Sequence, residues 1–191
     1  MRDEVRDERF RPLGRDGTRQ HRSPSCWWNA KAGMFAHAVA AALDSDAARE
    51  AFGRFARGGW NHRVVNRFAY VQIKKVGGTG ISNSEELRAH ATKYADVLQQ
   101  QVQIYRPDLV LGCGVGGGSP AQLMAANVLP DGQERSTTKS GATWWQFSAA
   151  GRPRALVQLW HPARRGDRWT LYEDVWVSVR EVARSVGLGQ G

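Results

Sequence analysis

The chain has 191 residues, with 27 lysines and arginines against 18 acidic residues and a formal net charge of +9. This length fits one domain with its own core, and the charge, carried mostly by arginine, favours polyanionic partners, nucleic acid first. The alternative is a basic surface that only keeps the protein in solution. No run approaches the roughly 20 apolar residues that a membrane span needs, so we expect no membrane partner. The two cysteines, Cys26 and Cys113, exclude a disulfide framework and offer no metal-ligand spacing, so we expect a reduced cytoplasmic compartment and no metal.

The N-terminal third begins with a charged segment and continues with helices. Residues 1–25 are rich in arginine and poor in aliphatic side chains, which predicts a basic arm or loop ahead of a single domain over residues 26–191. Apolar spacing predicts helices over 27–43 and 46–57. The β-branched and aromatic residues that follow predict a strand over 68–73.

The remaining elements alternate between helices and strands. Ser82 and Glu85 have capping-box spacing and predict a single helix that continues to Tyr105. The later elements predicted from periodicity are a strand over 108–113, a helix over 121–129, strands over 143–147 and 154–160, and a helix over 171–185. This alternation predicts an α/β fold with a short, mostly parallel central sheet, whose ligands lie beyond the carboxyl ends of the strands.

A glycine-rich loop follows the strand over 108–113. Residues 112–117 match the G-x-G-x-x-G pattern of dinucleotide sites, but the motif lies more than half-way along the chain and no acidic residue closes a following strand. We therefore expect no dinucleotide and no other cofactor. Glycine also allows the backbone to approach a base or phosphate closely, which makes Gly114 a candidate pocket residue.

The stretch ALVQLWHPARRG, residues 155–166, places a histidine at the end of an apolar strand. A lone histidine near a core is commonly a hydrogen-bonded packing residue. Here His161 precedes a rigid proline and three arginines, Arg164, Arg165 and Arg168, whose planar groups suit phosphates and base edges. This context favours a functional His161 that faces a DNA base, with the arginines on the DNA backbone.

Residues 68–75, FAYVQIKK, carry a second set of candidates. The amide of Gln72 offers a donor and an acceptor side by side, as reading a base edge requires, and Lys74 and Lys75 suit phosphates. The alternatives are a surface glutamine and a solvated turn. Most tryptophans are expected in the core, but aromatic rings also stack on bases, which makes Trp28 and Tyr70 candidate walls of a base pocket.

Taken in order, these pieces resemble the uracil-DNA glycosylase superfamily from about Ser23 to Val186. In that superfamily one strand ends in a base-reading amide, as FAYVQIKK does at Gln72. A later Pro-Asp-hydrophobic strand ends in glycine, as in RPDLVLGCG. A penultimate strand ends in His-Pro, as in LWHPARRG, and RSPS at 22–25 is similar to the Ser/Pro loop that contacts phosphates.

The chain departs from the superfamily pattern in two ways. The family's first motif, which positions the attacking water through Asp or Asn, is absent from its usual place, and Asp16 is the nearest acid. Either the water is held differently, or an upstream portion is absent, or the protein does not hydrolyse. In addition, Ala163 stands where serine usually follows His-Pro, and Gln72 replaces the commoner asparagine.

The resemblance implies a three-layer α/β/α sandwich and a monofunctional DNA glycosylase that hydrolyses the N-glycosidic bond of a flipped-out base and leaves an abasic site. His161 would stabilise the leaving base, Gln72 would select it, and Asp16 is the candidate acid. The residues expected on the DNA backbone are Arg164, Arg165, Arg168, Lys74, Lys75, Ser23 and Ser25. The departures favour a modified base, such as glucosylated hydroxymethylcytosine in phage DNA, and hence antiviral defence. The alternatives are repair of uracil or other deaminated bases and a non-catalytic DNA-binding module.

Overall fold

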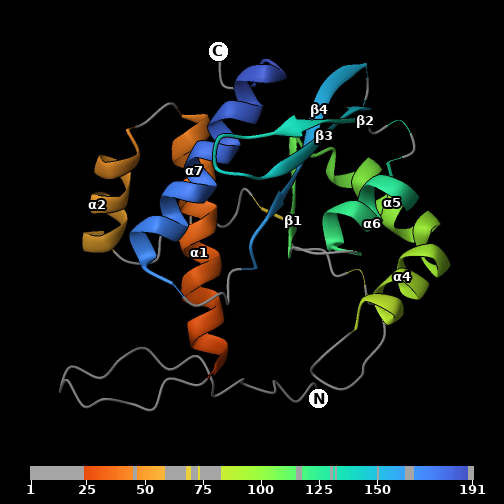
Figure 1. The fold of residues 1–191 in the computed structure, drawn as a ribbon, viewed down its shortest axis with the longest axis horizontal. Coiled ribbons are helices and arrows are strands. Elements are labelled where there is room, and N and C mark those ends of the chain that lie inside the picture. Colours follow the sequence, from red (N-terminus) through yellow and green to blue (C-terminus); the bar gives the residue numbers. More distant parts are fainter. Residues whose placement is uncertain are drawn as a thin grey trace, which may run out of the picture.

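A four-stranded mixed sheet with helices on both faces organises the chain in the computed structural model (Figure 1). The structure describes residues 24–44, 47–58, 68–69, 73, 83–114, 118–129, 131, 133–149, 151–161 and 166–188, with the backbone alone described for 24–31, 58, 133–136 and 149. The strands are β1 (Leu109–Cys113), β2 (Gln133–Thr137), β3 (Thr143–Ala149) and β4 (Arg152–Leu159), in the order β1-β4-β3-β2. The predicted α/β class is therefore confirmed.

The sheet is less parallel than the alternation of elements predicted. Among the described strands, β1 and β4 are parallel, whereas β4 with β3 and β3 with β2 are antiparallel. Short turns join β2 to β3 and β3 to β4, and a short connection can join only antiparallel neighbours. The prediction of a mostly parallel sheet is wrong for this part of the chain, because β2 was missed and the turn beside Gly151 was not interpreted as a hairpin.

Helices α1 (Pro24–Leu43) and α7 (Arg168–Ser185) lie on one face of the sheet, and α2 (Ala48–Gly58) packs against these two helices. Trp144, Val157 and Leu159 point into this layer and pack with apolar residues of α1 and α7. Tyr172 of α7 is fully buried there, and its hydroxyl lies 2.9 Å from Nδ1 of His37 on α1. The buried hydroxyl thus has the partner that its burial requires.

The opposite face carries α4 (Ser84–Lys93), α5 (Ala95–Tyr105) and α6 (Pro120–Asn127), which pack on Trp145, Phe147 and Leu156. The single helix predicted up to Tyr105 is two helices, because Tyr94 leaves helical geometry at φ −113° and ψ 22°. The cap is Asn83, whose Oδ1 accepts the Glu86 N–H at 2.7 Å. The capping-box prediction for Ser82 and Glu85 was therefore one residue early.

The predicted strand over 68–73 falls mainly outside the described residues. Phe68, Ala69 and Ile73, which are described, are not in a strand. Phe68 packs on the α1 and α7 cluster, whereas Ile73 is buried in the cluster on the α4–α6 face. At the N-terminus, residues 1–23 also lie outside the described part, and α1 begins at Pro24, so the backbone of Ser25 is helical rather than in a loop.

An ion pair joins the amino ends of the two parallel strands. Asp108, just before β1, accepts a hydrogen bond from the guanidinium of Arg154 near the start of β4. The side chain of Arg154 is 11% exposed and that of Asp108 is 64% exposed. The aspartate of the Pro-Asp-hydrophobic motif therefore compensates a buried positive charge at the edge opposite to His161.

Because Arg154 is buried and Asp108 is exposed, replacing each partner should lower the free energy of unfolding by a different amount. Asp108→Ala leaves the buried guanidinium without its counter-charge and is expected to lower the free energy of unfolding by about 1–3 kcal/mol. Arg154→Met keeps the apolar stem and leaves only an exposed carboxylate, so it should cost less than about 1 kcal/mol. Urea unfolding measures both, with Arg152→Met on the exposed start of β4 as control. Equal costs for the two variants would contradict this account.

Candidate functional site

The carboxyl ends of β1 and β4 lie side by side and define the candidate site. The register pairs Cys113 with Leu159 at the last positions of the two strands. One residue further, the N–H of Gly114 donates to the carbonyl of Leu159 at 2.8 Å. The loop after β1 and the Trp160-His161 segment after β4 therefore leave the sheet at the same edge, as predicted for the carboxyl ends of parallel strands.

The glycines of the G-x-G-x-x-G motif that are described have structural roles. A Cβ on Gly112 would lie 2.5 Å from the Cβ of Ala121, so glycine lets α6 pack directly on β1. Gly114 has φ +136°, which L side chains rarely adopt. Helix α6 begins with its own cap, because Oγ of Ser119 accepts the Gln122 N–H at 3.3 Å.

His161 follows β4 directly and is exposed to solvent. Its neighbour Trp160 is 42% exposed, in contrast to Trp144 and Trp145, which are buried in the two layers. The prediction that most tryptophans lie in the core is therefore confirmed for Trp144 and Trp145. It is wrong for Trp160, which precedes His161. Two exposed residues, a tryptophan and a histidine, thus follow each other in the chain at this edge of the sheet.

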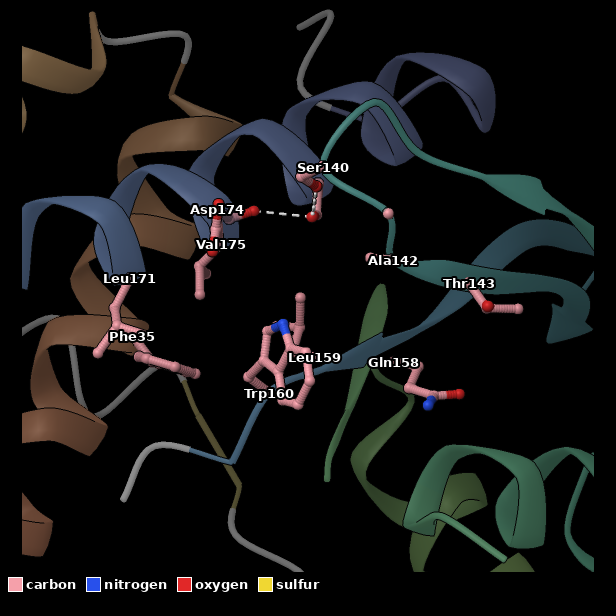
Figure 2. Close-up of a pocket in the computed structure, with 12 residues that line it drawn as sticks. Phe35, Ser140, Ala142, Thr143, Gln158, Leu159, Trp160, Leu171, Asp174 and Val175 are labelled. Atoms are coloured by element: carbon pink, nitrogen blue, oxygen red, sulfur yellow. Dashed lines mark hydrogen bonds between the residues drawn. The ribbon is translucent and has the colours of Figure 1, made fainter. Parts of the chain in front are cut away.

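A pocket opens beside Trp160 on the face covered by α1 and α7 (Figure 2). Its walls come from the turn between β2 and β3, the carboxyl end of β4, and one side of α7. Its volume is about 80 Å³, and the lining residues are Phe35, Ser140, Gly141, Ala142, Thr143, Gln158, Leu159, Trp160, Leu171, Asp174, Val175 and Ser178. Neither His161 nor Gly114 lines it, so the structure places these two candidates at the edge and not in the cavity.

A chain of hydroxyl groups ties the β2–β3 turn to α7 along one wall of the pocket. Oγ of Ser178 donates to the carbonyl of Asp174 at 2.7 Å and also bonds to Oγ of Ser140. Oγ of Ser140 lies 3.0 Å from Oγ1 of Thr138, which accepts the Ala142 N–H at 3.0 Å. These contacts hold the turn in place over the pocket.

The carboxylate of Asp174 is the one acidic side chain of this lining. Among the described residues no hydrogen bond or ion pair engages it, although its backbone carbonyl is bonded to Ser178. Sequence reasoning missed both residues. A signal existed, since Asp174 and Ser178 fall at helical spacing within the inward stripe formed by Leu171, Val175 and Val182.

The start of α7 carries Arg168, an exposed residue predicted to contact DNA. Asp167 caps this helix by accepting the Thr170 N–H at 2.9 Å. That backbone hydrogen bond from Thr170 is the main cause that lowers the pKa of Asp167. Because the helix end is occupied by its own carboxylate, a DNA phosphate in this region would have to contact arginine side chains.

The other predicted residues are described only in part or not at all. Trp28 lies in α1, where the backbone alone is described. Those outside the described residues are Asp16, Ser23, Tyr70, Gln72, Lys74, Lys75, Arg164 and Arg165. The convergence of Gln72 with His161 therefore stays a prediction.

Comparisons of the chain with protein-family models, with curated proteins and with solved structures found no match. Within the described part of the chain, no set of three or more histidine, cysteine or acidic side chains could hold a metal ion. Among the same residues, no helix has the length and apolar character needed to cross a membrane.

Cys113, the last residue of β1, is the nucleophilic group nearest in sequence to the glycine loop. Burial raises the pKa of its thiol to about 11, because desolvation disfavours the thiolate. At neutral pH the side chain is a protonated thiol, and only the thiolate is a strong nucleophile. The raised pKa therefore disfavours Cys113 as a covalent nucleophile at this edge.

This raised pKa predicts how stability depends on pH. Between the pKa of the unfolded thiol, near 9, and the folded value of about 11, the folded state holds a proton that the unfolded state has lost. The free energy of unfolding should then fall as pH rises through this range, by up to about 2–3 kcal/mol. Chemical denaturation at pH 8 and pH 11 measures the decrease. It should be smaller in Cys113→Ala and retained in Cys26→Ser; an unchanged decrease in Cys113→Ala would contradict the assignment.

Proposed function

We propose that this protein is a DNA glycosylase that hydrolyses the N-glycosidic bond of an everted base. The observation that carries the proposal is the parallel pairing of β1 with β4, which brings exposed His161 out at the carboxyl edge beside Gly114 and next to a pocket. Ligands of α/β sheets bind at such edges. The net charge of +9 suits a DNA partner.

We propose further that the chain is a divergent three-layer α/β/α glycosylase fold in which Gln72 reaches the same edge. Helices on both faces of the sheet support this arrangement. Ile73, the neighbour of Gln72 in the chain, is buried against Leu156 and α6 residues. The burial of Ile73 in this cluster supports the proposal, because Ile73 is the residue next to Gln72 in the chain.

The proposed reaction breaks the bond between C1′ and the base nitrogen, with the electron pair leaving on the base. His161 donates a hydrogen bond to the base where negative charge grows, and a preorganised donor of this kind contributes about 3–4 kcal/mol in measured enzymes. The oxygen of a water molecule bonds to C1′ and its proton is released, which leaves an abasic sugar and a free base. Asp16 is the proposed acid that orients this water.

In the proposed complex the DNA backbone is held by basic side chains around this edge. Arg168 at the start of α7 is exposed, and Arg164, Arg165, Lys74, Lys75, Ser23 and Ser25 complete the proposed contact set. The proposed substrate is a modified cytosine, such as glucosylated hydroxymethylcytosine in phage DNA, excised in the cytoplasm as a defence. Repair of a deaminated base is the alternative substrate class.

The proposal is tested by excision. Duplexes that contain uracil, hypoxanthine, 5-hydroxymethylcytosine or its glucosylated form are incubated with the protein, and abasic sites are then cleaved with alkali. Strand breaks are expected on at least one modified duplex. His161→Ala should lower the excision rate about 100–1,000-fold, as the loss of one preorganised donor does, with little change in DNA affinity.

Matched readouts separate catalysis from folding. Thermal melting of His161→Ala checks that the variant is folded, and fluorescence anisotropy with the same duplexes gives its affinity. DNA binding without breaks on any duplex would favour a non-catalytic module. Equal losses of rate and affinity would give His161 a structural role and overturn the proposed mechanism.

A second prediction concerns the phosphate contact of Arg168. Arg168→Ala should weaken DNA binding and reduce the slope of log K against log salt by about 0.9, because each phosphate contact releases condensed counterions. Arg184→Ala is the matched control, since Arg184 is exposed at the other end of α7, about 24 Å away at 1.5 Å per residue. Identical slopes for wild type and Arg168→Ala would remove Arg168 from the interface.

A further inference from the structure

The hydroxyl groups in the pocket wall have a fixed direction of donation. The single proton of Ser178 is given to the carbonyl of Asp174 at 2.7 Å, so the bond between Ser178 and Ser140 must use the proton of Ser140. Thr138 must then donate to Ser140. All three hydroxyl protons are consumed inside the wall, and Ser140 and Ser178 can offer a ligand only lone pairs.

The carboxylate of Asp174 adds to this acceptor surface. It lines the cavity and has no hydrogen bond or ion pair among the described residues. Two further lining residues with polar side chains, Thr143 and Gln158, belong to strand positions that alternate away from this face, and Figure 2 draws both side chains directed away from the centre of the pocket. The hydroxyl and carboxylate side chains that face the cavity are thus acceptors, in a protein whose net charge is +9.

The size and the aromatic wall of the pocket limit its occupant. A volume of about 80 Å³ is well below the roughly 300–1,000 Å³ of drug-sized ligand sites, so the occupant is a small group and not a nucleotide. Trp160, 42% exposed, offers a ring on which a planar heterocycle can stack. An anionic, acceptor-rich pocket beside an aromatic ring suits a planar group that carries N–H donors.

We propose that the pocket beside Trp160 binds the exocyclic amino group of a cytosine- or adenine-type base, with Asp174 as the acceptor of its N–H groups. The identification of the ligand as a base in DNA rests on the proposed function, whereas the preference for an amine follows from the pocket. The substrates of the site would then be bases that carry an amino group, and Asp174 on α7 would select them.

The same wall disfavours bases that carry only carbonyl groups. The amino group of cytosine projects from the ring and presents two N–H donors, which a carboxylate and a serine lone pair can share. With N1 bonded to the sugar, uracil has one ring N–H, at N3, which lies between two carbonyl oxygens. If that N–H bonded to Asp174, the two carbonyl oxygens of uracil would lie near the acceptor oxygens of the pocket wall. The hydroxyl protons of Ser140 and Ser178 are already used within the wall and could not be donated to them.

Calorimetric titration of the full chain with cytosine and uracil, each methylated at N1 where the sugar is attached in DNA, tests the pocket directly. Cytosine is expected to bind at least about tenfold more tightly than uracil, since a hydrogen bond to a charged group is the stronger kind. Asp174→Asn, which introduces a donor, should weaken cytosine about tenfold and remove the preference. Glu173→Gln is the matched control, because it removes the same charge from the adjacent, exposed position of α7 and should leave both affinities unchanged.

A second variant protects the test against misfolding. Trp160→Ala changes a half-exposed side chain and should weaken both bases to a similar extent, because stacking does not distinguish them. Equal affinities of the wild type for cytosine and uracil, or an Asp174→Asn variant that is folded by thermal melting and keeps the cytosine preference, would overturn the proposal.

Excision with the same variants separates this inference from the proposed function. If the protein releases an amino base in preference to uracil and Asp174→Asn loses this preference, both the glycosylase function and the amine-binding pocket are supported. Excision with no such preference retains the glycosylase and overturns the amine site. Asp174-dependent binding of cytosine without excision of any base retains the amine site and overturns the glycosylase.

Discussion

The parallel pairing of β1 with β4 is the constraint on which the candidate site depends. Two strands that run in the same direction end at the same edge, and the bond from Gly114 to the carbonyl of Leu159 extends the pairing one residue past the strands. At the other edge the Asp108–Arg154 ion pair holds the amino ends together. The position of His161 relative to the glycine loop is therefore set by backbone register and not by the loops themselves.

The turn between β2 and β3 reaches the same edge by a different route. Because β3 is antiparallel to β4, the turn that precedes β3 lies beside the carboxyl end of β4. The hydroxyl of Ser140 in this turn bonds to Ser178 on α7, which ties the turn to the helix at the wall of the pocket. The antiparallel half of the sheet, which the alternation of elements did not predict, thus supplies a wall of the candidate binding site.

The hydrophobic periodicity of the sequence predicted most helices and strands near their observed positions. The elements that it predicted wrongly have identifiable physical causes. The apolar spacing of residues 83–105 continues across Tyr94, so periodicity could not reveal the break between α4 and α5. Strand β2, Gln133–Thr137, has no apolar alternation and contains mainly polar residues of an edge strand. Of the motif glycines, Gly114 directly follows β1, whereas Gly112 lies within the strand and serves helix packing.

The sequence by itself determined the α/β class, the basic charge and the emergence of His161 at the end of a strand, because charge and hydrophobic period are properties of local residues. Only the tertiary structure decided which strands are parallel, that Trp160 is exposed, and that Ser140, Asp174 and Ser178 line one pocket. Those facts depend on pairing and packing between residues far apart in the chain. No local pattern of side chains contains that information.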